Sequence, residues 1–365
     1  MGARRAWCER SGRLTESSEA DEASVANAPR PQAQGKPLAR LRAGSSEGSA
    51  QALPQTQGQV LNGYLNVLKP PGMTSHNVIG RLRRLTGLRR IGHAGTLDPA
   101  AAGVLPVAIG SATRTLSSHE WDVKLYWADV RFGASTDTDD AEGMIREVGD
   151  PGRVDLEAAR AVLPQFLGDI RQRPPAYSAV RVEGRRAYAE ARRGAPQELP
   201  ERAAHIDAIA VLGWEAPVLS LLIQCRSGTY IRSIARDLGM ALACPAHLSA
   251  LVRLRVGPFA IRDALTLAAL ETIAGRATWD SVLWPPDIIA AEMKAIVVAR
   301  PRLVDFGYGR SWRAGEGLGV WQRSMPASAR VYAAEGALVG FVTLASGDRW
   351  QPSGGLPTAG VAKKR

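Results

Sequence analysis

The chain has 365 residues, 45% of them hydrophobic, which is enough for one large domain or two with a sizeable core. Its net charge of +11 is typical of proteins that bind phosphate-rich partners, although a solvated basic surface explains it equally well. No run of 18 apolar residues is present to span a membrane. The three cysteines are far apart in the sequence, which gives no support for a disulfide framework or a cysteine metal site. The five histidines show no HxxxH spacing, so they give no support for a metal site either.

Residues 1–58 are rich in Ala, Ser, Gln, Gly, Arg and Pro and show no sustained apolar period. Such a segment cannot bury enough surface to offset its ordering entropy, so it is predicted to be a disordered extension. Arg4, Arg5 and Arg10 leave an organelle transit peptide open as an alternative, but the acidic stretch 16–23 is atypical of one. A translation start upstream of the natural one is a third interpretation.

Order is expected to begin at residue 63, with a strand over 64–68 and a Pro-Pro-Gly turn at 70–72. Ser75 is then the expected N-cap of a helix. Its apolar stripe consists of Val78, Leu82 and Leu85. Its other side and the residues beyond it carry only basic charge: Arg81, Arg83, Arg84, Arg89 and Arg90. Because no acids match these arginines, phosphate contact is favoured over a merely solvated face.

The stretch GHAGTLDPAAAGVLPV at 92–107 presents one carboxylate, Asp98, among small residues. Pro99 biases Leu97 and Asp98 toward extended or turn geometry, and the glycines permit another backbone or a ligand to approach closely. This setting suits a nucleophile or a base. For an isolated Asp-Pro pair, however, a carboxylate that caps a helix or stabilises a turn is the commoner case.

Alternation predicts a strand over 124–133, and helical spacing is present over 154–168. Residues 219–242 indicate a buried strand, a turn and then a helix. Arg232 and Arg236 lie four residues apart near the start of that helix, where a cation opposes the macrodipole. They are therefore expected to meet an acid or a phosphate, with a surface salt bridge as the alternative.

Two polar segments lie between these elements. Residues 135–143, STDTDDAEG, fail the EF-hand template and are interpreted as a polar loop. In residues 171–194, arginines interleave with Tyr177 and Tyr188. Since guanidinium groups bind phosphates and aromatic rings stack on bases, an RNA-facing element is favoured over an ordinary basic loop and helix.

A proline pair within 281–287 predicts a linker, and short strands are expected within 329–344 around a turn at Glu335 and Gly336. Strands and helices alternate without a regular βαβ rhythm, so the predicted class is α+β. The expected organisation is a main domain over 59–285, a small β module over 286–355 and a basic tail over 356–365.

Five motifs resemble those of the bacterial TruB family of tRNA pseudouridine synthases, in the same order and spacing. They are LKPPGMTS, GHAGTLDPAAAGVLPV, KLYWADVRFGASTDTDDAEG, RPPAYSAVRVEGRRAYAEARRG and RSGTYIRSIARDLG. The resemblance is strong over about 62–265 and weaker to about 355. It implies a pseudouridine synthase domain with a mixed, largely antiparallel sheet, followed by a PUA-like RNA-binding module.

The resemblance also implies site residues. The catalytic residues are Asp98, Tyr126 and Arg232, with Arg232 pairing with the aspartate. The substrate-binding residues are His93 at the flipped nucleotide, Tyr230 and Leu251 in the uracil pocket, Lys69 of the early Lys-Pro motif, and Tyr177, Arg181, Arg185 and Arg186 of the basic element. Two departures concern RNA contacts: Arg181 stands where lysine is common, and residues 251–253 are LVR in place of LRR.

The implied reaction is isomerisation of uridine 55 in the tRNA T-loop to pseudouridine, without cofactor or metal. The base would leave the stack and enter a roomy pocket. One carboxylate suffices because no water is activated, and Asp98 would attack C1′ or take the C2′ proton. The expected partner is the tRNA T-arm, with no membrane and no obligatory protein partner, and a cytoplasmic monomer is expected.

Three alternatives stay open. The chain could be a related synthase acting on another RNA, or a non-catalytic RNA chaperone that folds tRNA through the same basic surface. A glycosidase-like base remover would need a second carboxylate near Asp98, for which residues 135–143 are the nearest candidate.

Overall fold

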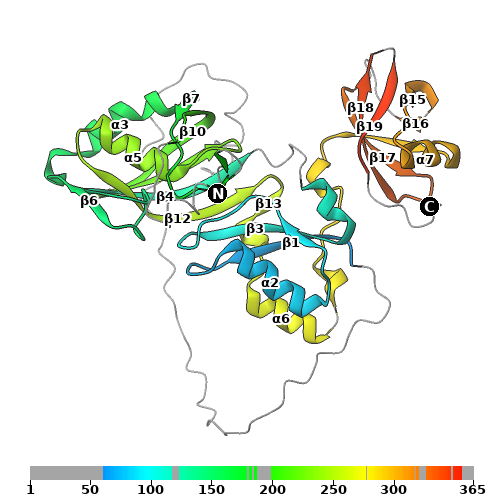
Figure 1. The fold of residues 1–365 in the computed structure, drawn as a ribbon, viewed down its shortest axis with the longest axis horizontal. Coiled ribbons are helices and arrows are strands. Elements are labelled where there is room, and N and C mark those ends of the chain that lie inside the picture. Colours follow the sequence, from blue (N-terminus) through cyan, green and yellow to red (C-terminus); the bar gives the residue numbers. More distant parts are fainter. Residues whose placement is uncertain are drawn as a thin grey trace, which may run out of the picture. The chain divides into compact units, whose positions relative to one another are not determined.

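The structure is a computed structural model that describes residues 61–116, 123–178, 181–182, 185–186, 199–276, 278–316, 318–319, 326–346 and 348–355. The predicted disordered extension at 1–58 and the basic tail at 356–365 lie outside the described residues. Half of the arginine-rich segment 171–194, including Tyr188, lies outside them as well. Figure 1 shows the elements discussed below.

One mixed sheet of nine strands forms the centre of the part that precedes residue 285 (Figure 1). Its main path runs β1-β3-β12-β4-β11-β10-β7, with β2 paired to β3 and β13 to β12. All of these pairs are antiparallel except β3 with β12, so the predicted mixed, largely antiparallel sheet is confirmed. The strands are β1 (Gly63–Lys69), β2 (Ile91–His93), β3 (Ala102–Ile109), β4 (Lys124–Phe132), β7 (Gly168–Gln172), β10 (Arg202–Glu215), β11 (Val218–Cys225), β12 (Ala246–Val256) and β13 (Phe259–Ala260).

The predicted alternation in β4 has a clear structural cause. Tyr126, Ala128, Val130 and Phe132 are buried in one core, while Trp127 on the opposite face is exposed. Side chains on successive strand residues point to opposite faces of a sheet, so one face of β4 builds the core. Helix α5 (Ile231–Ala241) covers this core with Ile234, Ala235 and Leu238.

Helix α2 (Ser75–Thr86) and helix α6 (Leu267–Arg276) share a second core with β1 and β3. The N-cap of α2 is Thr74, so the expectation for Ser75 is wrong by one residue. Thr74 has extended backbone and accepts a hydrogen bond from the Asn77 amide at 3.0 Å. The Ser75 hydroxyl is instead committed to the loop that carries Asp98.

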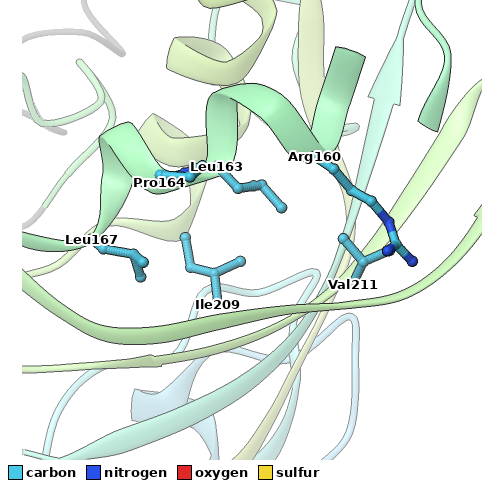
Figure 2. Close-up of a pocket in the computed structure, with 6 residues that line it drawn as sticks. All are labelled: Arg160, Leu163, Pro164, Leu167, Ile209 and Val211. Carbon is cyan, nitrogen blue, oxygen red and sulfur yellow. The ribbon is translucent and has the colours of Figure 1, made fainter. Parts of the chain in front are cut away.

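A short hairpin, β5 (Ala134–Thr136) with β6 (Ile145–Val148), extends from the end of β4, and residues 137–144 form its loop. The described remainder of this part contains α3 (Leu156–Val162), a two-residue hairpin of β8 (Arg181–Val182) with β9 (Arg185–Arg186), and short 3-10 helices. These helices are η3 (Gly110–Thr115), η5 (Pro151–Arg153), η6 (Leu163–Phe166), η7 (Ile261–Asp263) and η8 (Trp279–Ser281). Helix α3 and η6 cover β10 and border an apolar groove of about 300 Å³ (Figure 2).

A separate six-stranded sheet lies within residues 294–355 and has its own core, which includes Trp312 and Trp350. Its order is β15-β19-β18-β17-β14-β16. The predicted turn at Glu335 and Gly336 joins β17 to β18, with Gly336 at φ 88°. The helices and strands from residue 288 onward are η9 (Ile288–Ala290), β14 (Lys294–Val298), α7 (Arg300–Gly307), β15 (Trp312–Arg313), η10 (Ala314–Glu316), β16 (Leu318–Gly319), β17 (Ser328–Ala333), β18 (Leu338–Ala345) and β19 (Arg349–Gly355). The α+β class is confirmed.

Candidate active site

Asp98 lies in the loop between β2 and β3 and faces Arg232 of α5. The Arg232 Nε atom is 3.0 Å from one carboxylate oxygen, and its Nη2 atom donates to the other at 3.3 Å. The Arg232 side chain is 7% exposed and that of Asp98 37% exposed, so a buried cation holds a carboxylate that is still open to solvent. Bidentate pairing fixes both the position and the plane of the carboxylate.

The backbone of the Asp98 loop is bonded to the turn before α2. The Ser75 hydroxyl donates to the Leu97 carbonyl at 3.0 Å and accepts from the Leu97 amide at 2.9 Å. On the other side of Asp98, the Gly72 amide donates to the Pro99 carbonyl at 2.9 Å. The loop is therefore held immediately before and immediately after the candidate catalytic residue.

Lys69, for which the resemblance implies a substrate-binding role, contributes to the same attachment. Its side chain is fully buried, and its Nζ donates to the carbonyls of Pro70, Met73 and Pro99 at 2.8, 2.6 and 3.1 Å. An ammonium has three protons, and these three bonds use all of them. Lys69 in this structure supports the loop that carries Asp98.

Arg253 of β12 fixes the loop from the sheet side. Its guanidinium is 1% exposed and donates to the carbonyls of Val104, Thr96 and Gly95 at 2.9, 3.2 and 3.2 Å. Sequence reasoning noted this position only as the last residue of LVR and gave it no role. Arg255 on the same strand carries the same charge, so the sequence holds no signal that distinguishes Arg253.

Arg232 joins three segments that are distant in the chain. Besides Asp98, it contacts Asp140 at 3.4 Å and donates to the carbonyls of Thr138 and Tyr177, each at 3.0 Å. The expectation that an arginine at this helix start meets an acid is confirmed, and the surface salt bridge is excluded because the side chain is buried. Residues 135–143 were interpreted as a polar loop and as the nearest candidate for a second carboxylate near Asp98, but their role in fixing Arg232 was missed.

Asp140 is the second carboxylate on Arg232, but its surroundings differ from those of Asp98. One of its oxygens accepts from the Thr138 hydroxyl at 2.6 Å and from the Glu142 amide at 3.1 Å. Its side chain is 13% exposed. These bonds tie Asp140 to its own loop, which leaves Asp98 as the accessible carboxylate of the pair.

Tyr126 lies opposite Arg253 in the register of β4 and β12. Burial raises the pKa of its hydroxyl; Arg253, within hydrogen-bonding reach, opposes this, and nearby Asp98 adds to it. The phenol therefore stays protonated at neutral pH. Leu251, two residues before Arg253, packs against the core that contains Tyr126.

Tyr230 is the N-cap residue of α5 and lies two residues before Arg232. Gln172 of β7 accepts from the Tyr230 amide at 3.1 Å and donates to its carbonyl at 3.3 Å. This buried glutamine stands in for a capping side chain, because Tyr230 itself makes no capping hydrogen bond. The start of α5 is thereby fixed relative to the sheet.

His93 ends β2 and is half-buried. Burial, and then the charge of Arg253, lower the pKa of its imidazole below the ordinary value. A neutral ring suits contact with a base more than pairing with a phosphate.

The remaining predicted RNA contacts lie in the basic element. Arg181 pairs with Arg186 in backbone register, and Val182 with Arg185, so these residues share one hairpin. Tyr177 is joined to the site through its carbonyl on Arg232. Among the residues that the structure describes, no group of three His, Cys, Asp or Glu side chains could hold a metal ion, and no helix is long and apolar enough to cross a membrane.

A single accessible carboxylate, held by a buried arginine beside a buried tyrosine on a mixed sheet, defines the class of pseudouridine synthases. Two solved structures share the fold: a Cbf5-Nop10-Gar1 complex (TM-score 0.60, 26% identity, covering 77% of this chain and 78% of that one) and an H/ACA RNP bound to a substrate RNA containing 2′-deoxyuridine (TM-score 0.61, 23% identity, covering 81% and 85%).

The sequence comparisons identify the family. The N-terminal domain of the TruB family of pseudouridylate synthases matches residues 83–231, and the C-terminal domain of tRNA pseudouridylate synthase B matches residues 232–288. The tRNA pseudouridine synthase B of Gloeobacter violaceus is 54% identical over 58% of this chain and 73% of its own. That of Dehalococcoides mccartyi is 38% identical over 80% of this chain and 96% of its own. The chain belongs to the TruB family of pseudouridylate synthases.

Proposed function

We propose that this enzyme converts uridine 55 in the T-loop of tRNA to pseudouridine, with Asp98 as the reactive group. The observation that carries the assignment of Asp98 is its pairing: Arg232 is buried and Asp98 is accessible, with 3.0 Å between the Arg232 Nε and the carboxylate. The relatives that are named tRNA pseudouridine synthase B support tRNA as the substrate.

The reaction breaks the bond between C1′ and N1, turns the uracil and forms a bond between C1′ and C5. The proton on C5 is lost and N1 gains one, so substrate and product are isomers and no redox partner is consumed. Asp98 would either form a bond to C1′ or take the proton from C2′. Both routes require one carboxylate held next to the ribose, and Arg232 holds that of Asp98 in place through its two contacts.

Tyr126 would stack on the uracil, since its ring lies on β4 beside Arg253 and the Asp98 loop. Tyr230 and Leu251 would line the pocket, because Tyr230 starts the helix of Arg232 and Leu251 packs against the core of Tyr126. His93 would contact the flipped nucleotide as a neutral ring. The small residues around Asp98 leave room for ribose and a turning base, which must leave the stack to react.

The basic hairpin of β8 and β9 and the sheet at 294–355 are the proposed RNA-binding elements outside the pocket, the latter as a PUA-like module. We propose 59–285 as the catalytic domain and 286–355 as the module. Because the proposed substrate is a tRNA T-arm, the enzyme is further proposed to act in the cytoplasm as a monomer without an obligatory protein partner.

A second candidate is activity on another RNA, favoured by the fold shared with a solved H/ACA RNP bound to a substrate RNA. The test is incubation of the purified protein with an unmodified tRNA transcript, followed by nucleoside mapping of pseudouridine. Pseudouridine at position 55 supports the proposal. Pseudouridine elsewhere, or only in other RNAs, supports the second candidate, and refolding of tRNA without any pseudouridine supports the chaperone.

A further inference from the structure

A groove of about 450 Å³ lies between the 70–73 turn and the exposed side of α2. It is separate from the residues assigned to the reaction. Its lining is Gly72, Met73, His76, Asn77, Gly80, Arg81 and Arg84. No acidic residue lines it, whereas three of the seven lining side chains are arginine or histidine.

The groove adjoins the Asp98 loop through hydrogen bonds on both sides of Asp98. Gly72, one of its lining residues, donates to Pro99, and Ser75, which directly precedes His76, is bonded to Leu97. The groove therefore lies beside the loop that carries Asp98.

The charge in the groove is available to a ligand. Arg81 is paired with Glu271 of α6, so its charge is partly compensated within the protein. His76 and Arg84 are exposed. Gly80 keeps the floor between them open, since a Cβ there would meet only the Arg84 Nη1 atom, at 4.0 Å. Among the residues that the structure describes, no acidic side chain pairs with Arg84, and a guanidinium in such a setting suits a phosphodiester better than a neutral ligand.

We propose that this groove binds the RNA backbone next to the target uridine, with Arg84 contacting a phosphate within the first nucleotides on one side of it and His76 completing the wall. The inference rests on the proposed function and names a part of the substrate site that neither the motifs nor the comparisons assign. The groove thereby adds a fixed phosphate contact on the catalytic domain, separate from the basic hairpin.

The experiment measures binding of a T-arm hairpin across a salt series. Two variants test the groove: Arg84→Glu, and Gly80→Glu, which brings a carboxylate close to Arg84. Each is expected to raise Kd by about three- to tenfold. Each should also reduce the steepness of log K against log salt by about 0.7–0.9. Arg160→Glu is the control: it makes the same charge change at an exposed arginine in the groove of Figure 2, and it should bind as wild type does.

A second measurement replaces single phosphates flanking the uridine by neutral methylphosphonates. At the contacted phosphate, the effect of Arg84→Glu on Kd should shrink to less than half, because the partner is already absent. The groove proposal is refuted if the effects of Arg84→Glu and of the methylphosphonate on Kd add fully at every flanking phosphate. It is also refuted if folded Arg84→Glu and Gly80→Glu proteins keep the wild-type salt dependence of binding. Neither result affects the proposed function as long as the wild type forms pseudouridine. Wild-type protein that makes no pseudouridine overturns the proposed function instead, and the binding cycle still decides the groove.

Discussion

Asp98→Asn separates catalysis from structure because it keeps the size of the side chain and removes its charge. Arg232 loses an ion pair with contacts of 3.0 and 3.3 Å. It keeps Asp140 at 3.4 Å and the carbonyls of Thr138 and Tyr177 at 3.0 Å each. Breaking a fully buried pair costs about 3–5 kcal/mol. Since Asp98 is 37% exposed and Arg232 retains three partners, we expect a loss of only about 1–2 kcal/mol.

Turnover should respond very differently. If Asp98 is the only reactive group, the single-turnover rate should fall by at least about 10⁴-fold, while tRNA affinity stays within about threefold because phosphate contacts and T-arm shape dominate binding. Asp140→Asn is the matched control, because it removes the other carboxylate from Arg232. It should cost comparable or greater stability and far less activity. Melting temperature, tRNA affinity and single-turnover rate are measured on both variants, and a folded, tRNA-binding Asp98→Asn protein with near-normal turnover would refute the mechanism.

Further tests address the basic hairpin, the two buried cations and the cofactor requirement. Replacing Arg185 and Arg186 by Ala should weaken tRNA binding and flatten its salt dependence by about 0.7–0.9 per lost phosphate contact, whereas an unchanged slope means that they face solvent. Arg253→Lys should lower both the melting temperature and turnover, because each carbonyl left unpaired costs about 1–3 kcal/mol. Arg255→Lys on the same strand is the control, and equal effects of the two substitutions would contradict the role of Arg253 in holding the Asp98 loop. Burial lowers the pKa of Lys69 to about 8 from 10.5, so the unfolded chain holds a proton between these pH values that the folded chain has lost. Stability relative to Lys69→Met should therefore rise with pH across that window in urea unfolding, and a flat difference would contradict the shift. Pseudouridine formation on an isolated T-arm hairpin should persist in EDTA, and loss restored by one divalent metal would argue against a carboxylate acting alone.

Periodicity predicted the elements of this protein well where one face is buried. Strand β4 and helix α5 each show a clean apolar pattern because one side of each packs into a core. The cap of α2 was misplaced by one residue, since Thr74 and Ser75 are both good capping residues. In the structure the Thr74 hydroxyl accepts from the Asn77 amide, whereas the Ser75 hydroxyl is bonded to Leu97, a contact that spans 22 positions.

The site was predicted from motifs more completely for the reacting groups than for their support. Asp98 and Arg232 were expected to pair, and they do. The part played by Asp140 depends on where the β5–β6 hairpin places its loop, which no local pattern encodes. Lys69 and Arg253 were hard to interpret for the same reason: a cation whose partners are backbone carbonyls leaves no matching charge in the sequence.

The placement of β12 has a consequence for how activity arises during synthesis. The strand that carries Asp98's loop, β3, and the strand that carries Tyr126, β4, are not neighbours; β12 inserts between them. Where it joins them, Gly103 lies so close to Arg253 that a Cβ there would be 2.2 Å from the Arg253 carbonyl oxygen. A nascent chain that has not yet exposed residues 246–256 outside the ribosome holds Asp98 and Tyr126, the proposed site residues, but not the strand that lies between their strands. Such long-range closure is slow and late, so incomplete chains are expected to lack the assembled pocket and to leave tRNA unmodified.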